Sequence, residues 1–324
     1  YINIIYKLKM DNLREKIDSS RNIKENSLNA YLISIKKLNE FITKKEFKNL
    51  DFLKDEKKVL EKLKQLKLTT QKNYLSAIIV SLSAYGDKYE DDLKTYRKRL
   101  EQLNEVYNSE IKKNEKTETQ EKNWVSMKEL RKVMNSYKLD LKERGAFSKD
   151  ELTRRELDIL QRWVVANLYL NDDNPPIRLD YGNMRIISEK DFDKLKDDDL
   201  DKNFLVVKNR ANKFFHFGDY KTEKTYDKKE IKVGKKLNSV LNIWLKHNKK
   251  GGLLYDTKGN PMSSNTLGKY IKKVFEKTGK QVSVNMLRHI YISEKFPPQK
   301  EKEKEEVASK MLHSKGTQQN YSKK

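Results

Sequence analysis

Ten consecutive residues without an apolar side chain divide this chain of 324 residues into two parts. They are residues 113–122, with the sequence Lys-Asn-Glu-Lys-Thr-Glu-Thr-Gln-Glu-Lys. Such a segment buries no apolar surface that could offset the entropy lost on ordering it, so it contributes to no core. The chain length also predicts about two domains. We therefore expect one domain over residues 11–112, a linker over 113–122 and a second domain over 123–324.

The first domain carries the apolar spacing of helices along its whole length. Leucine, isoleucine and aromatic residues recur three and four positions apart, which places them on one face of a helix. The helices predicted there span residues 27–44, 53–66, 69–85 and 90–112. No proline precedes Pro175, so nothing in this part of the chain interrupts the pattern. Met10 is the first methionine, and we base no structural expectation on residues 1–9.

The second domain alternates helices with a few short strands. The predicted helices span residues 126–140, 151–170, 235–247, 264–277, 284–295 and 301–312. Segments rich in β-branched and aromatic residues predict strands at residues 204–207, 212–217 and 229–233. Two successive prolines, Pro175 and Pro176, end the long helix before them. We predict a mainly α protein with a small antiparallel β-sheet, which is an α+β fold.

The charge of the chain predicts a polyanionic partner. The sequence has 71 Lys and Arg against 48 Asp and Glu, a formal net charge of +23. Each phosphate that Lys or Arg neutralises releases condensed counterions, which makes double-stranded DNA or another nucleic acid the leading candidate. The alternative is that the lysines form ordinary solvated faces. Charge alone does not separate these two interpretations.

Several classes of chemistry are disfavoured by what the sequence lacks. It has no cysteine, which excludes disulfides, thiolate zinc sites, iron–sulfur clusters and a cysteine nucleophile. Its four histidines include no pair at the spacing of a helical zinc site. The runs at 172–173 and 197–199 are interpreted as solvated loops rather than magnesium ligands. No stretch resembles a membrane span or a signal peptide. We expect a soluble protein with no metal, no cofactor and no membrane partner.

The end of the chain holds three motifs in close succession. The segment Val284-Asn-Met-Leu-Arg-His-Ile-Tyr291 forms part of a predicted helix. It is followed by Met311-Leu-His-Ser314, and Tyr321 stands eight residues after His313. The set combines a basic residue on a helix, a histidine in a turn and a tyrosine close behind it.

Two further motifs lie upstream. Pro175-Pro-Ile-Arg-Leu-Asp-Tyr181 directly follows a long predicted helix, and Asp219-Tyr-Lys-Thr222 lies between two predicted strands. With the C-terminal motifs, these make the chain resemble the tyrosine recombinases, the phage-type integrase family, over nearly its whole length. The Pro-Pro, Tyr-Lys-Thr and His-Ser details are similar to integrases of virophages and large DNA viruses. For a virus-encoded enzyme this implies an intracellular location, in the host cytoplasm, a viral factory or the nucleus.

The resemblance implies both an activity and a set of catalytic residues. In family order, these residues are Arg178, Lys221, Arg288, His313 and Tyr321. The implied activity is site-specific DNA recombination or integration, in which DNA is cleaved and rejoined through a covalent 3′-phosphotyrosine. The implied architecture is a helical core-binding domain and a catalytic domain that clamp duplex DNA, with protomers assembling into a dimer or tetramer.

These residue types suit the implied chemistry. A phenol has a pKa near 10 and is a poor nucleophile unless its anion is stabilised as Tyr321 attacks phosphorus. Arg178 and Arg288 would stabilise the charge that builds on the nonbridging oxygens. Lys221 would protonate the leaving 5′ oxygen, because an ammonium can give up a proton. His313 would donate to a phosphate oxygen or position the tyrosine. Neither ATP nor a metal ion is needed.

The chain departs from the family pattern in two places. Asn285 stands where the family usually has a histidine, so a hydrogen bond remains there but no proton transfer. The interval from His313 to Tyr321 is one residue shorter than usual. On the hairpin, Lys224 competes with Lys221 for the role of general acid.

Taken singly, the site residues have ordinary explanations. Tyr321 is one of 17 tyrosines and lies in a polar tail. Arg178 could simply form an ion pair with Asp180, and His289 could be a buried structural residue. We expect Asp180, His289 and Asn285 beside the catalytic residues. Two other functions stay open: strand relaxation by a type IB topoisomerase, and DNA binding without catalysis.

Overall fold

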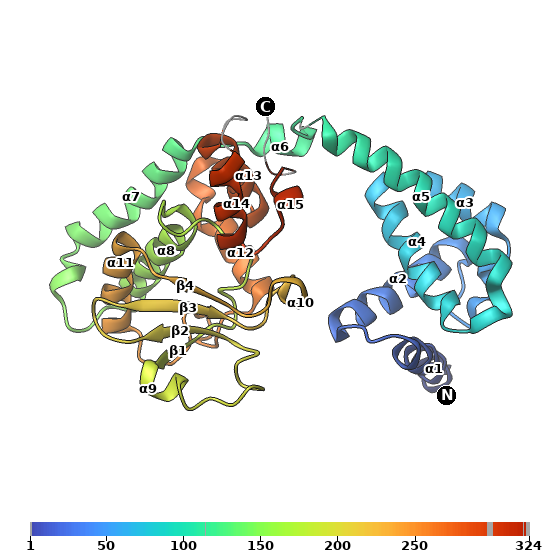
Figure 1. The fold of residues 1–324 in the computed structure, drawn as a ribbon, viewed down its shortest axis with the longest axis horizontal. Helices are drawn as coiled ribbons and strands as arrows, with labels where there is room; N and C mark the ends of the chain where they lie inside the picture. Colours follow the sequence, from blue (N-terminus) through green and yellow to red (C-terminus); the bar gives the residue numbers. More distant parts are fainter. Residues whose placement is uncertain (1, 114, 297–300, 320, 322–324) are drawn as a thin grey trace. The chain divides into compact units, whose positions relative to one another are not determined.

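The computed structural model describes residues 2–113, 115–296, 301–319 and 321. The chain divides into two compact units, Tyr1–Lys113 and Asn114–Lys324, drawn in Figure 1. The boundary falls at the start of the predicted linker. Helix α6 (Glu118–Asn123) forms inside that linker, capped by Thr117, and buries none of its residues. The roles that we assigned to the two domains stay predictions.

The first unit is helical. Its elements are α1 (Ile2–Ser20), α2 (Glu25–Thr43), α3 (Glu56–Lys64), α4 (Leu68–Ser83) and α5 (Glu90–Lys112), with 3₁₀ turns at Leu50–Leu53 and Gly86–Tyr89. The four predicted helical segments are confirmed. Helix α1 adds a fifth, and its Leu13 and Ile17 are buried in the core of this unit. The hydroxyl of the fully buried Tyr96 donates a hydrogen bond of 2.6 Å to the carbonyl oxygen of Leu53.

The second unit combines helices with one sheet. Its helices after α6 are α7 (Met127–Glu143), α8 (Arg154–Leu170), α9 (Glu189–Phe192), α10 (Glu223–Tyr226), α11 (Lys235–His247), α12 (Ser264–Val274), α13 (Val284–Lys295), α14 (Glu301–Lys310) and α15 (Lys315–Gln319), with 3₁₀ turns at Ala146–Ser148 and Glu276–Thr278. The predicted helices are confirmed, and the predicted α+β class holds. The short helices α9, α10 and α15 were not predicted.

The sheet has the strand order β1-β2-β3-β4. Its strands are β1 (Arg185–Ser188), β2 (Asn203–Val207), β3 (Lys213–Phe217) and β4 (Lys229–Lys232). The three predicted strands pair antiparallel as expected. Strand β1 was missed and pairs parallel to β2, so the sheet is mixed. Its four residues contain only two apolar side chains, which are adjacent, and this gives no alternating pattern to recognise.

Helix α8 runs through the core of the second unit, between α7 and α11 (Figure 1). It ends at Leu170, before the two prolines. The side chain of Asn174 then ties the chain to the end of β4: its Nδ2 donates to the carbonyl oxygen of Lys232 at 3.0 Å, and its Oδ1 accepts from the amide of Gly234 at 2.8 Å. These bonds hold the segment that leads to Arg178.

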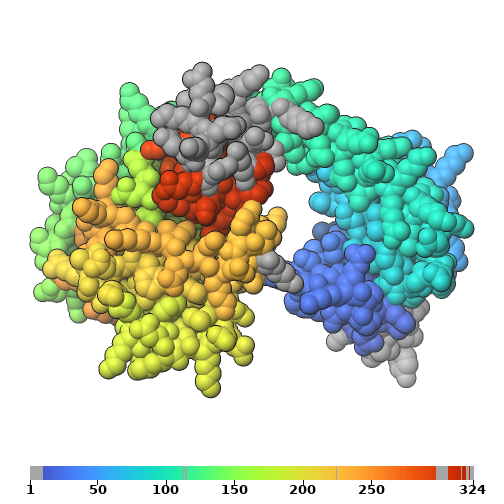
Figure 2. Space-filling view, in the orientation of Figure 1, coloured from blue at the N-terminus to red at the C-terminus, as the bar shows by residue number. Residues whose placement is uncertain are grey.

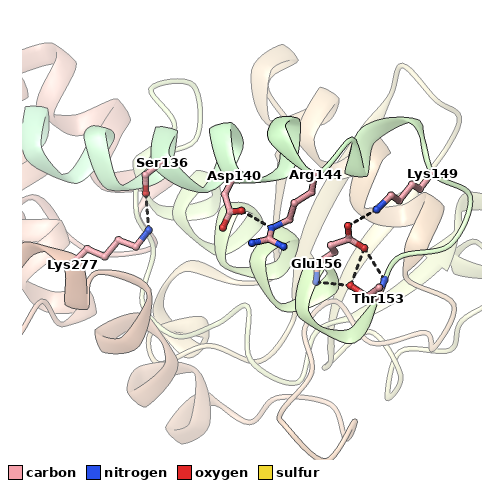
Figure 3. Close-up of polar contacts among 7 residues, drawn as sticks. All are labelled: Ser136, Asp140, Arg144, Lys149, Thr153, Glu156 and Lys277. Atoms are coloured by element: carbon pink, nitrogen blue, oxygen red, sulfur yellow. Dashed lines mark hydrogen bonds and ion pairs between the residues drawn. The ribbon is translucent and has the colours of Figure 1, made fainter.

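The start of α8 is fixed by a cap (Figure 3). The Thr153 hydroxyl and the side chain of Glu156 form a reciprocal capping box, and Lys149 Nζ lies 2.6 Å from Glu156 Oε1. The hydrogen bond from Lys149, followed by those from Thr153, lowers the pKa of Glu156 to about 2. This buried carboxylate is therefore ionised and fully paired, and it anchors the helix that carries the first arginine motif at its other end.

A buried lysine attaches the sheet to α11. Lys213, the first residue of β3, places its Nζ 2.8 Å from Asn238 Oδ1, 2.6 Å from Asn242 Oδ1 and 3.0 Å from the carbonyl oxygen of Arg210. Both asparagines also donate to that carbonyl oxygen. The charge is thus satisfied by neutral oxygen atoms, and burial lowers the pKa of Lys213.

We predict that Lys213→Met lowers the free energy of unfolding by about 2 to 4 kcal/mol, because it leaves buried oxygen atoms without a donor. The matched control is Lys208→Met on the same hairpin. Lys208 is exposed and pairs only with Glu189, so its loss should leave stability close to wild type. All three tryptophans lie in the second unit, so urea unfolding followed by tryptophan fluorescence reports on it. Equal stability of the two variants would contradict the assigned role.

Candidate active site

The tyrosine of the last motif lies on the arginine of α13. Arg288 Nη1 donates a hydrogen bond of 2.7 Å to the hydroxyl oxygen of Tyr321, and the guanidinium carbon lies 4.3 Å from the centroid of its ring. His289 and Ser293, one helical turn apart, both contact the Tyr321 carbonyl oxygen, His289 through Nδ1 at 3.0 Å and Ser293 through its hydroxyl at 3.3 Å. One face of α13 therefore fixes both ends of Tyr321. His289 contacts the tyrosine directly, which its position on the helix did not reveal.

Arg178 reaches the same region from the end of α8. Its guanidinium is half-buried, and Nη1 donates to the carbonyl oxygen of Leu312 at 3.1 Å. The hydroxyl of Tyr169 on α8 donates to the Arg178 carbonyl oxygen at 2.9 Å, which fixes the backbone of the segment. Leu312 directly precedes His313, so the first arginine and the histidine turn are joined.

His313 is buried beside this arginine pair. Its side chain is 2% exposed, and Nδ1 lies 3.0 Å from the carbonyl oxygen of Ser314. Because a carbonyl only accepts, Nδ1 carries the hydrogen, and Nε2 of the neutral ring is an acceptor. Burial, and after it the charge of Arg288, lowers the pKa of His313 to about 4. The ring centroid lies 5.4 Å from that of Tyr321.

Several buried polar atoms of this region lack a partner among the described residues. They are Nε and Nη2 of Arg288, Nε2 of His313 and both amide atoms of Gln318. Among its described residues, the second unit has two other buried charged side chains, Glu156 and Lys213, and those are hydrogen-bonded. A buried donor without an acceptor costs about 1 to 3 kcal/mol. Two Arg288 donors therefore have no acceptor among the described residues, and the oxygen atoms of an anion would supply them.

The charge of the site is positive. Burial lowers the pKa of Arg288 to about 10, Tyr321 opposes this, and the charge of Arg178 adds to it. The charge of Asp180 acts on Arg288. Burial raises the pKa of Asp180 to about 6, against the opposing charges of Arg178 and Arg288. An ion pair with Asp180 was the ordinary alternative for Arg178; the described ion pairs do not include it, although the charge of Arg178 acts on Asp180. The two guanidinium groups are thus incompletely neutralised, as an anion-binding site requires.

Two of the predicted site residues, Asn285 and Lys221, take no part in the contacts described above. Asn285 is exposed at the start of α13, on the same helical face as His289 four residues later. Lys221 is exposed in the connection between β3 and β4. Its neighbour Thr222 does enter the site, because its hydroxyl donates to the Leu312 carbonyl oxygen at 2.7 Å. Figure 2 shows the C-terminal segment, in red, against the gold surface of this connection.

Sequence reasoning missed three residues here: Asn203, Thr222 and Gln318. The amide of Asn203 donates to the carbonyl oxygens of Asp180 and Asp219, at 3.0 and 2.9 Å, and accepts from the amides of residues 218 and 219. It thereby joins the arginine segment to the hairpin. The only signal in the sequence for Thr222 is that it belongs to the Tyr-Lys-Thr motif, and an isolated Asn or Gln carries none.

A second basic pocket of about 840 Å³ is separate from this site. Arg154 and Arg155 at the start of α8 line it, together with Lys249 after α11. Arg178 follows the opposite end of α8, whose 17 residues span about 25 Å at 1.5 Å each. The pocket contains none of the residues that the sequence singled out. Within the described part of the chain, no group of His, Asp and Glu lies close enough together to hold a metal ion.

The chain was compared with known proteins. No protein-family model matches it, and no curated protein matches it. Among solved structures, the crystal structure of XerA recombinase matches 97% of this chain and 92% of its own, with 12% sequence identity and a TM-score of 0.39. A match of this size says nothing about function. None of the helices that the structure describes is long and apolar enough to cross a membrane.

We predict that His313 makes the stability of the second unit depend on pH. Its pKa is about 4 in the folded chain against an ordinary value of 6.5, so below pH 6.5 the unfolded chain takes up a proton that the folded chain does not. This lowers the free energy of unfolding by up to about 3 kcal/mol between pH 6.5 and 4. Asp180 acts in the opposite direction, because its pKa is raised to about 6.

The comparison with His313→Gln separates these effects. Both proteins retain Asp180, so the difference between their free energies of unfolding isolates the histidine. As the pH falls from 7 to 4, the wild type should lose about 3 kcal/mol of its free energy of unfolding relative to His313→Gln. Urea titrations at each pH measure it. A difference that is constant over this range would show that His313 does not titrate as its surroundings require.

Proposed function

We propose that this protein is a tyrosine-class site-specific DNA recombinase, which cleaves and rejoins DNA through a covalent 3′-phosphotyrosine. The observation that carries the proposal is the hydrogen bond from buried Arg288 to the Tyr321 hydroxyl, beside buried donors that lack acceptors. A phenol oxygen held at an incompletely neutralised cationic site is what attack on a phosphodiester requires. The order and context of the sequence motifs support the same reading.

The chemical step uses groups of this chain and solvent water. The Tyr321 oxygen attacks phosphorus, and the bond from phosphorus to the 5′ oxygen breaks. The phenol proton of the part-exposed Tyr321 passes to solvent water, and Lys221 gives a proton to the leaving oxygen. The products are a phosphotyrosine at a DNA 3′ end and a free 5′ hydroxyl. Attack by another 5′ hydroxyl reverses the step without ATP, because the phosphodiester energy is retained.

The two arginines hold the phosphate. Arg288 offers Nε and Nη2, which have no acceptor among the described residues, to its nonbridging oxygens. Arg178 adds a second permanent positive charge from the end of α8. Negative charge on the nonbridging oxygens is greatest in the transition state, when phosphorus is bonded to both the attacking and the leaving oxygen. The two arginines therefore stabilise the transition state more than the ground state.

The DNA partner and the assembly complete the proposal. The formal charge of +23 supplies the nonspecific attraction to a duplex. The helical first unit would contact the duplex, and protomers would assemble into a dimer or tetramer on it. The finer identification with integrases of virophages or large DNA viruses rests on the motif details alone.

The first test looks for the covalent intermediate. The protein is incubated, without metal ions, with randomised duplexes that are nicked so that cleavage releases a short oligonucleotide and religation fails. We expect a protein–DNA adduct that survives SDS, and sequencing of the trapped DNA then identifies the target. Tyr321→Phe should form no adduct, because it lacks the attacking oxygen, and should still bind DNA.

Three outcomes separate the alternatives. An adduct that persists in Tyr321→Phe would falsify the assignment of the nucleophile. Absence of any adduct, with DNA binding intact, would favour a binding protein without catalysis. Relaxation of supercoiled plasmid without strand exchange would favour a type IB topoisomerase.

We predict that Arg178→Ala slows formation of the adduct by about 100- to 1000-fold, the loss typical of removing one donor to a developing oxyanion. Rates are measured in single turnover at saturating DNA, so that binding does not enter. The matched control is Arg131→Ala, which removes an arginine of the same unit that pairs with Asp172. That variant should cleave at the wild-type rate. Cleavage by Arg178→Ala at a similar rate would remove Arg178 from the site.

A further inference from the structure

We infer that Thr222 is a positioning residue that holds Lys221 at the scissile phosphate, an inference that rests on the proposed recombinase function. The Thr222 hydroxyl donates to the Leu312 carbonyl oxygen at 2.7 Å, and Arg178 Nη1 donates to the same oxygen at 3.1 Å. One carbonyl therefore joins the arginine segment, the lysine hairpin and the histidine turn.

The backbone at this carbonyl is held in an uncommon conformation. Leu312 has φ of 56°, in the left-handed region that disfavours a residue with a Cβ. Its side chain is nevertheless buried. A strained residue of this kind persists only where its surroundings determine it. The two hydrogen bonds to its carbonyl oxygen are such a determinant, and Thr222 supplies the shorter one.

The rest of the hairpin connection is also fixed. Asn203 binds the backbone of Gly218 and Asp219 at its start. The hydroxyl of the buried Tyr220 donates to the carbonyl oxygen of Asp227 at 2.5 Å, which closes the loop on itself. Lys221 thus stands between a residue tied to Asp227 and a residue tied to the histidine turn. Its backbone is determined on both sides.

The two candidate general acids, Lys221 and Lys224, differ in their position relative to the Thr222 contact. Lys221 directly precedes the residue that contacts the Leu312 turn, so its reach toward the phosphate is set by that contact. Lys224 lies two positions beyond Thr222, inside α10, and its side chain is outside the described ones. A general acid must lie within hydrogen-bond reach of the atom that it protonates. The Thr222 contact therefore acts on Lys221, the residue directly before it in the chain.

A change of leaving group distinguishes a positioning role of Thr222 from a general effect on folding. In the proposed step, Lys221 transfers a proton to the 5′ oxygen as its bond to phosphorus breaks. If sulfur replaces that bridging oxygen, the leaving group is a thiolate. A thiol has a pKa of about 8.5, far below that of an alcohol, so a thiolate leaves without a proton. A defect in the general acid is then repaired by the sulfur substrate.

The experiment compares oxygen and sulfur substrates built on the target sequence recovered from the adduct. Thr222→Val keeps the branched shape and loses the donor, whereas Thr222→Ser keeps the donor. We expect Thr222→Val to cleave the oxygen substrate about 10- to 100-fold more slowly, which is part of the roughly 100- to 10,000-fold that general acid catalysis contributes. It should cleave the sulfur substrate about as fast as wild type. Thr222→Ser should match wild type on both.

Lys221→Ala and Lys224→Ala complete the set. Lys221→Ala should be slow on oxygen and restored on sulfur, and Lys224→Ala should match wild type on both. The inference is overturned if Thr222→Val is equally slow on both substrates, is not slow at all, or if sulfur fails to restore Lys221→Ala. Absence of any adduct with the wild-type protein is a different result, because it overturns the recombinase function itself.

Discussion

The burial of one guanidinium group is the constraint on which the second unit depends. Arg288 is 0% exposed, and a buried charge is costly unless it is paired and hydrogen-bonded. Among the described residues of this unit, the other buried charged side chains are Lys213 and Glu156, and both are hydrogen-bonded to the scaffold around them. Among the residues that the structure describes, Arg288 hydrogen-bonds only to the Tyr321 hydroxyl, through Nη1. An anion bound at this position would supply acceptors for the other donors, Nε and Nη2.

The surrounding elements hold that arrangement with few, short polar side chains. Asn174 fixes the chain after α8, Asn203 joins it to the hairpin, and Thr222 joins the hairpin to the histidine turn. Short side chains lose little conformational entropy when they are fixed, so they position a backbone more sharply than long ones. The site is therefore built from segments that are far apart in sequence and are joined mostly through backbone carbonyl oxygens.

Local patterns explain how much of the fold was predictable. Periodic apolar spacing identified the long helices, and β-branched runs identified β2, β3 and β4, because both patterns reflect a buried face. Strand β1 was not predicted, because its pairing with β2 and not its own sequence pattern identifies it as a strand. Helix α6 formed in a segment without apolar residues because its capping box needs only Thr117 and Gln120. Residue order also suggested Arg178, Arg288, His313 and Tyr321 as a set, and the structure brings them together.

What the sequence alone determined was the inventory: two units, a mainly helical fold with a small sheet, and an ordered set of arginines, lysine, histidine and tyrosine. These follow from local periodicity and residue chemistry. The tertiary structure decided which members of the set meet and in what state. That Arg288 has donors without an acceptor among the described residues, that His313 is neutral and that the Thr222 hydroxyl meets the Leu312 carbonyl oxygen depend on burial and contacts between distant segments. No local pattern encodes such contacts, because they arise only when the chain has folded.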